Sequence, residues 1–221
     1  MKKCIGIISW LPDDPTLRQT RLNSLNKTLS KVFKLFDLPV IIIAQNWQDS
    51  DINLNDNCII YRYDKLGILN ARKKLREKFL ESEYEYLIML DDDCYIEGTS
   101  ADTYLKFIDA HPDSCVRVHP TQLKLFAISK ALYSEFDMVD CDPEQNFAYE
   151  DSVFLELLAV IHYNKFFKLP PDKAEIYVDV KKTFKDSTWS TGKSAKVHST
   201  MRDNSRNYIS TYLKKYRERT N

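Results

Sequence analysis

Glycine is scarce in this sequence, with only four glycines among 221 residues. A glycine-rich phosphate-binding loop needs several glycines close together, whereas Gly6, Gly67, Gly98 and Gly192 are widely separated. The chain therefore lacks the loop that a sugar nucleotidyltransferase would carry after its first strand.

Cysteine and histidine are also few. The cysteines are odd in number and form no Cys-x-x-Cys pair, and they are Cys4, Cys58, Cys94, Cys115 and Cys141. A disulfide framework or a cysteine zinc site is therefore not expected. His111, His119 and His162 lack the spacing of a histidine zinc site. This pattern favours a reducing compartment, and we expect a cytoplasmic protein.

Long apolar runs are missing as well. No run approaches the roughly 18–20 residues that a membrane-spanning helix needs. The N-terminus has a short apolar stretch that ends at Pro12, Asp13 and Asp14. It is too short for a signal peptide, and a first buried strand is expected instead.

The net charge is zero but unevenly distributed. Residues 181–221 hold eleven basic and three acidic residues, so the rest of the chain carries a net charge of −8. An acidic body with a basic end suits binding of phosphates or of an anionic membrane surface. A solvated basic helix explains the same pattern.

Hydrophobic periodicity predicts alternating strands and helices. Strands are predicted at residues 4–10, 39–44, 58–63, 86–90, 114–118, 123–129 and 175–180. Helices are predicted at residues 16–36, around 71–79, and at 101–110, 150–163 and 208–219. This order indicates an α/β fold with a mostly parallel central sheet flanked by helices. The polar stretch 181–196 predicts a mobile loop.

Three consecutive aspartates, Asp91, Asp92 and Asp93, directly follow the predicted strand 86–90. At about 5 Å and an effective dielectric of about 20, each like-charge pair costs roughly 3 kcal/mol before screening. Ligands of open α/β sheets bind at the carboxyl ends of strands, and Mg²⁺ or Mn²⁺ bound there would remove the repulsion. A solvent-facing turn in which aspartates cap backbone amides is the alternative.

A second acidic pair, Glu150 and Asp151, opens the predicted helix 150–163. Carboxylates are favoured at a helix N-terminus for structural reasons alone, and a general base facing a metal site is the other interpretation. His198 lies between basic residues and is either an ordinary histidine or a ligand. The residues alone leave both choices open.

Four segments, taken in their order along the chain, resemble segments of the GT-A fold glycosyltransferases, most closely those of the family 2 nucleotide-sugar transferases. They are "KLGILNARKKL" (65–75), "YLIMLDDDC" (86–94), "LKLFAISKALYSEFDMVD" (123–140) and "YEDSVFLELL" (149–158). The resemblance covers about residues 1–160. It implies a metal-dependent enzyme that moves a hexose from a nucleotide-diphosphate sugar, UDP-linked, to an acceptor hydroxyl with inversion. Bacterial-type surface glycan synthesis is the implied setting, with a glycan or lipid-linked saccharide as acceptor and no nucleic acid partner.

The resemblance also implies roles for individual residues. Asp93, Asp91 and His198 would hold Mn²⁺ or Mg²⁺, Asp92 would contact the ribose, and Arg72 would support Asp91. Asp151 would deprotonate the acceptor. The remaining donor-binding positions would be Gln45 or Asn46 for the uracil, Lys65, and Lys193 and Lys196 from a closing loop.

The implied domain organisation is a single catalytic domain over residues 1–200, followed by a basic C-terminal helix over 201–221. The domain divides into a nucleotide-sugar half (1–98), an acceptor half (99–180) and a mobile loop (181–200). The C-terminal helix is suited to peripheral contact with a membrane.

The chain departs from the family pattern in several places. The usual acidic residue after the second strand is replaced by Gln45 and Asn46, and Lys73 and Leu75 replace the usual Asn and Gly after Arg72. The absence of a Gln-x-x-Arg-Trp segment argues against a processive synthase. A non-catalytic sugar- or metal-binding module, a sugar nucleotidyltransferase and a phosphatase using the same aspartates are the alternatives. For a dehalogenase-type phosphatase, Tyr95 stands where a small residue is expected.

Overall fold

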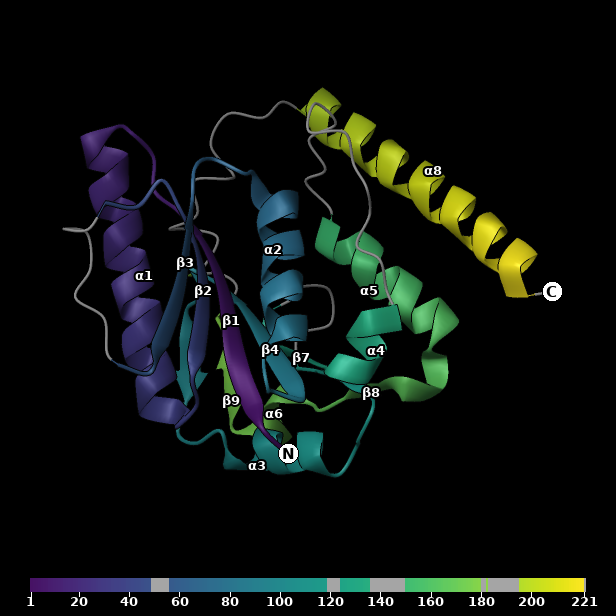
Figure 1. Ribbon diagram of the computed structural model, residues 1–221, viewed down its shortest axis with the longest axis horizontal. Helices are drawn as coiled ribbons and strands as arrows, with labels where there is room; N and C mark the ends of the chain where they lie inside the picture. Colours follow the sequence, from purple (N-terminus) through teal and green to yellow (C-terminus); the bar gives the residue numbers. More distant parts are fainter. Residues whose placement is uncertain (49–55, 119–123, 136–149, 180–181, 183–194, 221) are drawn as a thin grey trace.

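The computed structural model describes residues 1–48, 56–118, 124–135, 150–179, 182 and 195–220; the side chains of residues 150–153 and of parts of 195–220 are outside this description. A seven-stranded sheet runs through the described part in the order β3-β2-β1-β4-β7-β6-β8 (Figure 1). Its strands are β1 (Lys3–Trp10), β2 (Val40–Gln45), β3 (Cys58–Tyr63), β4 (Tyr86–Asp91), β6 (Cys115–Arg117), β7 (Phe126–Ser129) and β8 (Phe166–Lys168).

The topology places a switch point at the centre of this sheet. β1 pairs in parallel with β2 on one side and with β4 on the other. The chain therefore leaves β1 toward β2 and β3 and later returns to its other side. β7 is antiparallel to β4 and β6, while β8 is parallel to β6. Ligands of open α/β sheets bind at such a switch point, outside the carboxyl ends of the strands.

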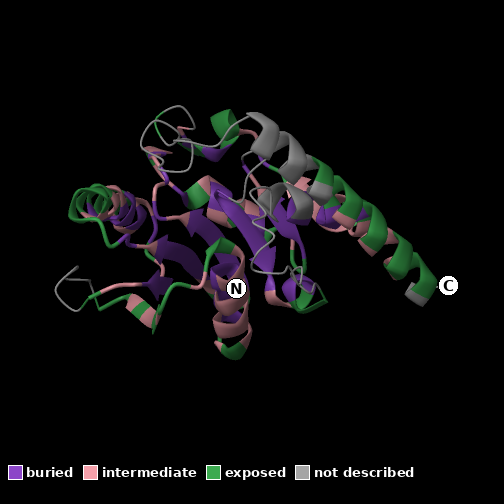
Figure 2. Cartoon of the chain, turned by 90° about the horizontal axis from the view of Figure 1, so that it is seen from above, coloured by how far each residue is buried: buried purple, intermediate pink, exposed green. Residues whose placement is uncertain are grey.

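Helices cover both faces of the sheet (Figure 1). They are α1 (Pro15–Leu35), α2 (Ile68–Glu81), α3 (Asp102–Asp109), α4 (Lys130–Glu135), α5 (Glu150–Ile161), α6 (Pro171–Ala174) and α8 (Ala195–Thr220), with a short 3₁₀ helix, η1 (Tyr163–Lys165). Alternate residues of β1 enter different cores, because successive strand side chains point to opposite faces. Ile5 and Ile7 pack with α1, whereas Cys4 and Ile8 pack with α2 and α5. Seen from above, the strands lie buried between exposed helix surfaces (Figure 2).

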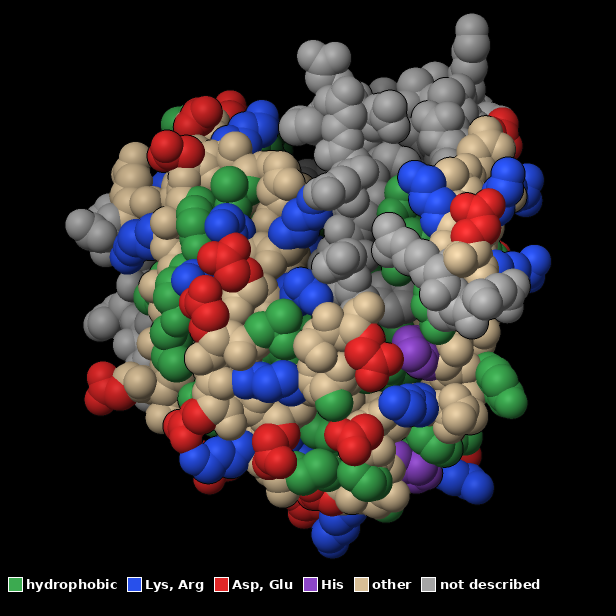
Figure 3. All heavy atoms as spheres, turned by 45° about the vertical axis from the view of Figure 1, so that its right-hand side comes forward, with side chains coloured by type: hydrophobic (Ala, Val, Ile, Leu, Met, Phe, Trp, Pro, Cys, Tyr) green, Lys and Arg blue, Asp and Glu red, His purple; other side chains and the backbone are tan. Residues whose placement is uncertain are grey.

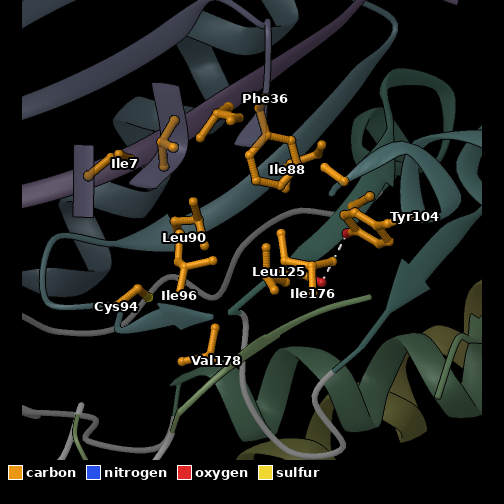
Figure 4. Close-up of a cluster of buried hydrophobic side chains, with 14 of the residues drawn as sticks. Ile7, Phe36, Ile88, Leu90, Cys94, Ile96, Tyr104, Leu125, Ile176 and Val178 are labelled. Carbon is orange, nitrogen blue, oxygen red and sulfur yellow. Dashed lines mark hydrogen bonds between the residues drawn. The ribbon is translucent and has the colours of Figure 1, made fainter. Parts of the chain in front are cut away.

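A second, two-stranded sheet extends the core on the α1 side. It pairs β5 (Ile96–Gly98) with β9 (Ile176–Val178) in antiparallel fashion. Ile96, Ile176 and Val178 are buried in the same cluster as Leu90 and Cys94 (Figure 4). The turn that carries the aspartates is thereby fixed between β4 and β5.

The predicted α/β architecture is confirmed, with differences in individual elements. The short elements β5, β8, α4 and α6 were not predicted, because three to six residues give too little periodicity to detect. The C-terminal helix begins at Ala195, so residues 195–200 are helical rather than part of the predicted loop. In the described part of the chain, no helix combines the length and apolar character that crossing a bilayer requires.

Candidate active site

The three aspartates lie at the switch point between β1 and β4. Asp91 is the last residue of β4 and is in register with Ile8 of β1. Asp92 accepts hydrogen bonds from Ser9 Oγ at 2.7 Å and from the Trp10 backbone N at 3.4 Å. The acidic turn is therefore joined to the carboxyl end of the neighbouring parallel strand.

The turn itself is held by internal and helix contacts. The Cys94 backbone N donates to the Asp91 carbonyl at 3.3 Å. Thr28 of α1 places its hydroxyl 3.1 Å from the Asp92 carbonyl and 2.9 Å from the Cys94 carbonyl. Because Thr28 is buried, these bonds anchor the turn to the middle of α1.

Three basic side chains surround the three carboxylates. Arg72 Nη2 lies 3.0 Å from Asp91 Oδ1, and Arg21 Nη1 lies 3.2 Å from Asp92 Oδ1 and 3.4 Å from Asp93 Oδ2. Lys124 Nζ lies 3.8 Å from Asp91 Oδ2 and 3.9 Å from Asp93 Oδ1. The repulsion within the triplet is thus balanced by side chains from α1, from α2 and from Lys124, two residues before β7.

The environment moves the pKa values of two adjacent aspartates in opposite directions. Burial opposes ionisation of Asp91, but the charges of Arg72, Lys124 and Arg21 outweigh it and lower the pKa of Asp91. For Asp92, burial raises the pKa to about 6, reinforced by Asp93 and opposed by Arg21 and the Ser9 hydrogen bond. The site therefore contains one firmly ionised carboxylate beside one that gains a proton in mild acid.

The predicted nucleoside-binding residues lie at the same edge of the sheet. Gln45, at the end of β2, is buried and accepts a hydrogen bond from the Leu66 backbone N at 2.9 Å. Asn46 Nδ2 donates to the Leu11 carbonyl at 2.8 Å and to Asp13 at 2.7 Å. Both amides thus shape the strand ends, and their role in uracil recognition stays a prediction. Lys65 Nζ lies 5.7 Å from the centre of the ring of Trp10, whose backbone N donates to Asp92.

The predicted base and loop residues are only partly placed. Asp151 lies in the first turn of α5, and Lys196 and His198 lie in the first turns of α8. Their side chains, and the whole of Lys193, are outside the described residues. The contributions of these four residues to the site remain predictions.

The carboxylates of the turn are better suited to a cation that is also bound by a diphosphate than to a cation bound by the protein alone. Among the described residues, no group of three or more His, Cys, Asp or Glu side chains is arranged to hold a metal ion. Mg²⁺, however, is commonly held by one or two carboxylates together with substrate phosphates and water. Asp91 and Asp93 supply such a pair, and Lys124 and Arg21 lie against it.

Sequence reasoning missed four residues of this site, which are Ser9, Arg21, Thr28 and Lys124. Arg21 and Thr28 are seven residues apart on α1, where a buried threonine and an arginine interrupt the edge of an apolar stripe. Lys124 stands within the otherwise apolar stretch 123–129 and is buried. A charged or polar residue at an expected core position was the available signal in each case.

A surface hollow of about 420 Å³ lies elsewhere, beside β5 and β9. Its lining residues are Gly98, Thr99, Pro171, Asp172, Glu175 and Tyr177. They include none of the predicted site residues, so we assign the candidate site to the aspartates, where strand ends and charges converge.

No protein-family model matches the chain, and no curated protein matches it in sequence. Its fold is similar to that of TarS from S. aureus, with 18% identity over 84% of this chain and 38% of TarS, at a TM-score of 0.53. The fold is also similar to that of TarS 1-349 in complex with UDP-GlcNAc, with 17% identity over 80% of this chain and 58% of that structure, at a TM-score of 0.55. For TarS 1-349 in complex with UDP, the identity is 17% over 84% of this chain and 63% of that structure, at a TM-score of 0.56.

In each case the chain spans less than two thirds of the length of the structure it matches. At these identities the likeness concerns the fold. The predicted fold class, a mostly parallel α/β sheet of the GT-A type, is confirmed.

Proposed function

We propose that this protein is a glycosyltransferase that moves a hexose from a UDP-sugar to an acceptor hydroxyl. One observation carries the proposal: the aspartate turn lies at the switch point of a GT-A-type sheet, next to the carboxyl end of β1. The UDP-GlcNAc and UDP complexes of TarS, which shares the fold, support a UDP-sugar as donor.

The described residues suit the donor side of such a reaction. Asp92, linked to Ser9, would contact the ribose, and the basic groups of Arg21, Arg72 and Lys124 would bring positive charge to a diphosphate. Asp91 and Asp93, with His198, would hold Mn²⁺ or Mg²⁺, which as a Lewis acid stabilises the departing diphosphate. Lys65, Lys193 and Lys196 are further proposed phosphate contacts.

On the acceptor side we assign the general base to Asp151, at the start of α5. Direct displacement of the diphosphate at the anomeric carbon inverts its configuration, and a base that removes the hydroxyl proton during this step typically contributes a factor of about 10²–10⁴ to the rate. The proposed acceptor is a glycan or lipid-linked saccharide of a bacterial-type surface polymer. The basic end of α8 would allow peripheral contact with the membrane that carries a lipid-linked acceptor.

Thermal unfolding with UDP, with and without Mn²⁺, tests the donor site. We expect UDP with Mn²⁺ to raise the melting temperature of the wild-type protein and of Asp109→Asn. Asp109 pairs with Lys3 at the amino end of β1, which makes it a control outside the site. Asp93→Asn should lose the shift. No shift with any nucleoside diphosphate would contradict the proposed donor class.

Turnover with a panel of nucleotide sugars and an acceptor array tests the reaction. Asp151→Asn should retain the UDP-dependent melting shift but lose transfer by about 10²-fold or more. Normal transfer by this variant would exclude Asp151 as the base. Donor binding without release of nucleoside diphosphate under any condition would identify a non-catalytic sugar-binding module instead.

A further inference from the structure

Lys124 lies against two carboxylates of the aspartate cluster, those of Asp91 and Asp93. Its Nζ lies between Asp91 Oδ2 and Asp93 Oδ1, at 3.8 and 3.9 Å. These distances exceed those of direct N–H···O hydrogen bonds, so the ammonium acts on both carboxylates chiefly through its charge. Asp91 and Asp93 are the two proposed metal ligands whose side chains the structure describes. Lys124 therefore places a positive charge next to both of these proposed ligands.

The position of Lys124 is fixed by its surroundings. The residue is only 7% exposed. Leu125, which follows it, has a φ of 54°, a left-handed conformation that is costly for a residue other than glycine. Leu125 is held there because its N–H donates to the Met89 carbonyl at 3.1 Å and its carbonyl accepts from Tyr104 Oη at 2.9 Å (Figure 4). The fold thus maintains a strained backbone directly beside the lysine.

The remaining carboxylate oxygens of the turn are also engaged. Arg72 lies on the other oxygen of Asp91, and Arg21 lies on the other oxygen of Asp93 and on Asp92. Among the described residues, three positive side chains thus lie against three negative ones. A divalent cation that binds Asp91 and Asp93 in this arrangement meets the ammonium of Lys124, so binding there brings like charges together. A diphosphate changes this balance because it adds negative charge.

We propose that Lys124 closes the metal site to a free divalent cation and makes cation binding depend on the nucleotide diphosphate. The proposal deepens the proposed function and rests on it for the identity of the nucleotide. In the ligand-free protein Lys124 holds Asp91 and Asp93 in place, and with a diphosphate bound its charge is shared with the phosphate oxygens. Lys124 is thus a positioning residue, and the coupling it creates is reciprocal between cation and nucleotide.

Titration of Mn²⁺ without nucleotide tests this role directly, with free Mn²⁺ measured by its electron paramagnetic resonance signal. Lys124→Met removes the charge and keeps most of the volume. We expect it to bind Mn²⁺ at least about tenfold more tightly than the wild-type protein, within the range of typical coupling effects. UDP should then increase the Mn²⁺ affinity of the variant by a smaller factor than that of the wild type.

Two further variants serve as controls. Lys3→Met removes a lysine whose side chain is equally buried, at 8% exposure, and which pairs with Asp109 at the opposite end of β1. It should leave Mn²⁺ binding unchanged. Lys124→Arg retains the charge and should keep the low affinity for free Mn²⁺. Should Lys124→Met fail to fold, Lys124→Gln provides the same comparison with a polar side chain.

The outcomes separate this inference from the proposed function. A gain in nucleotide-free Mn²⁺ affinity on removal of the charge supports the role of Lys124, whether or not any sugar is transferred. Unchanged or weaker Mn²⁺ binding by the neutral variants overturns it, even if UDP-sugars bind the wild-type protein. An equal gain in Lys3→Met would also overturn it, because the effect would then not be specific to the aspartate cluster.

Discussion

At the level of single residues, adjacent aspartates in this turn differ because their partners differ. Asp91 faces two basic side chains, Arg72 and Lys124, which lower its pKa despite burial. Asp92 shares Arg21 with Asp93 and is otherwise buried against Ser9, so its pKa rises to about 6. Neighbours in sequence thus receive separate chemical environments from side chains of α1, of α2 and of the turn that precedes β7.

The raised pKa of Asp92 predicts a pH-dependent contribution to stability. Since the folded state favours the protonated form, the contribution is complete below the unfolded pKa of 3.8 and is lost as pH rises through about 6. We expect the wild-type protein to lose on the order of 1–3 kcal/mol relative to Asp92→Asn between pH 4 and 7. Urea unfolding of both proteins in EDTA measures the difference, and a constant difference over this range would exclude the effect.

We predict that breaking the buried ion pair between Arg72 and Asp91 lowers the free energy of unfolding strongly. Arg72 is 2% exposed, and Arg72→Met leaves Asp91 with one of its two cations. We expect a loss of about 3–5 kcal/mol of unfolding free energy, with part of it recovered in the double variant Arg72→Met/Asp91→Asn. Arg76→Met, one turn later on α2, removes hydrogen bonds to the Tyr133 and Ser134 carbonyls and should cost less. Strict additivity of the two site substitutions would show that the pair is not coupled.

At the level of elements, the long and strongly periodic segments were predictable, whereas the short elements β5, β8, α4 and α6 were not. The first strand and α1 follow directly from their apolar patterns, because each buries a continuous face. β9 lies within the predicted strand 175–180, but its three-residue partner β5 was not predicted, because the two pair only through residues far apart in sequence. The first turns of α8 hold only a few apolar residues, such as Val197 and Met201, among polar ones, so they did not stand out by hydrophobic periodicity.

Gly98 leads to a prediction about how closely β5 must approach the segment before β9. It has a φ of 144°, and an added Cβ would lie 2.3 Å from the Glu175 carbonyl of the segment that leads into β9. Gly67, before α2, also has a positive φ of 77°, but an added Cβ there meets nothing within 4 Å. Gly67→Ala should therefore cost about 1–3 kcal/mol from backbone strain alone. Gly98→Ala should cost clearly more, because a backbone carbonyl cannot rotate away from the clash.

Chemical unfolding of both variants provides the measurement. Similar losses of stability in Gly98→Ala and Gly67→Ala would show that β9 can shift away from β5. Because β5 follows the aspartate turn directly, a shift of this kind would also be expected to weaken the donor-dependent melting shift of Gly98→Ala.

At the level of the whole molecule, the site could be located from the sequence but not completed. The aspartates were found because three acidic residues end a buried strand. Arg21 and Lys124 are separated from them by 71 and about 30 residues of chain, and only the tertiary fold brings the charges together. No local pattern specifies such a contact, since periodicity reports which face is buried and not which face it meets.

The charge distribution of the whole chain leads to a prediction about α8. Its apolar face is already used, because Ile209 is buried against α5 and Tyr212 and Leu213 pack beside it. Lys214, Lys215 and Arg217 are exposed near the end of the helix. The helix extends beyond the sheet (Figure 1), and Figure 3 shows several Lys and Arg side chains on the surface at the upper right. Contact with a membrane would therefore be electrostatic and would not require insertion of the helix.

We expect the protein to bind vesicles containing anionic phosphatidylglycerol at low salt and to dissociate as salt screens the charges. Charge reversal of Lys214, Lys215 and Arg217 to Glu should weaken partitioning by at least about 100-fold in a co-sedimentation assay. The matched control reverses three lysines of α1, on the other side of the sheet, which are Lys27, Lys31 and Lys34. Since residues 1–180 carry a net charge of −8, attraction must come from the basic end of the chain. Equal losses in both triple variants would mean that overall charge, and not α8, determines binding, whereas no binding by the wild-type protein would exclude this membrane contact.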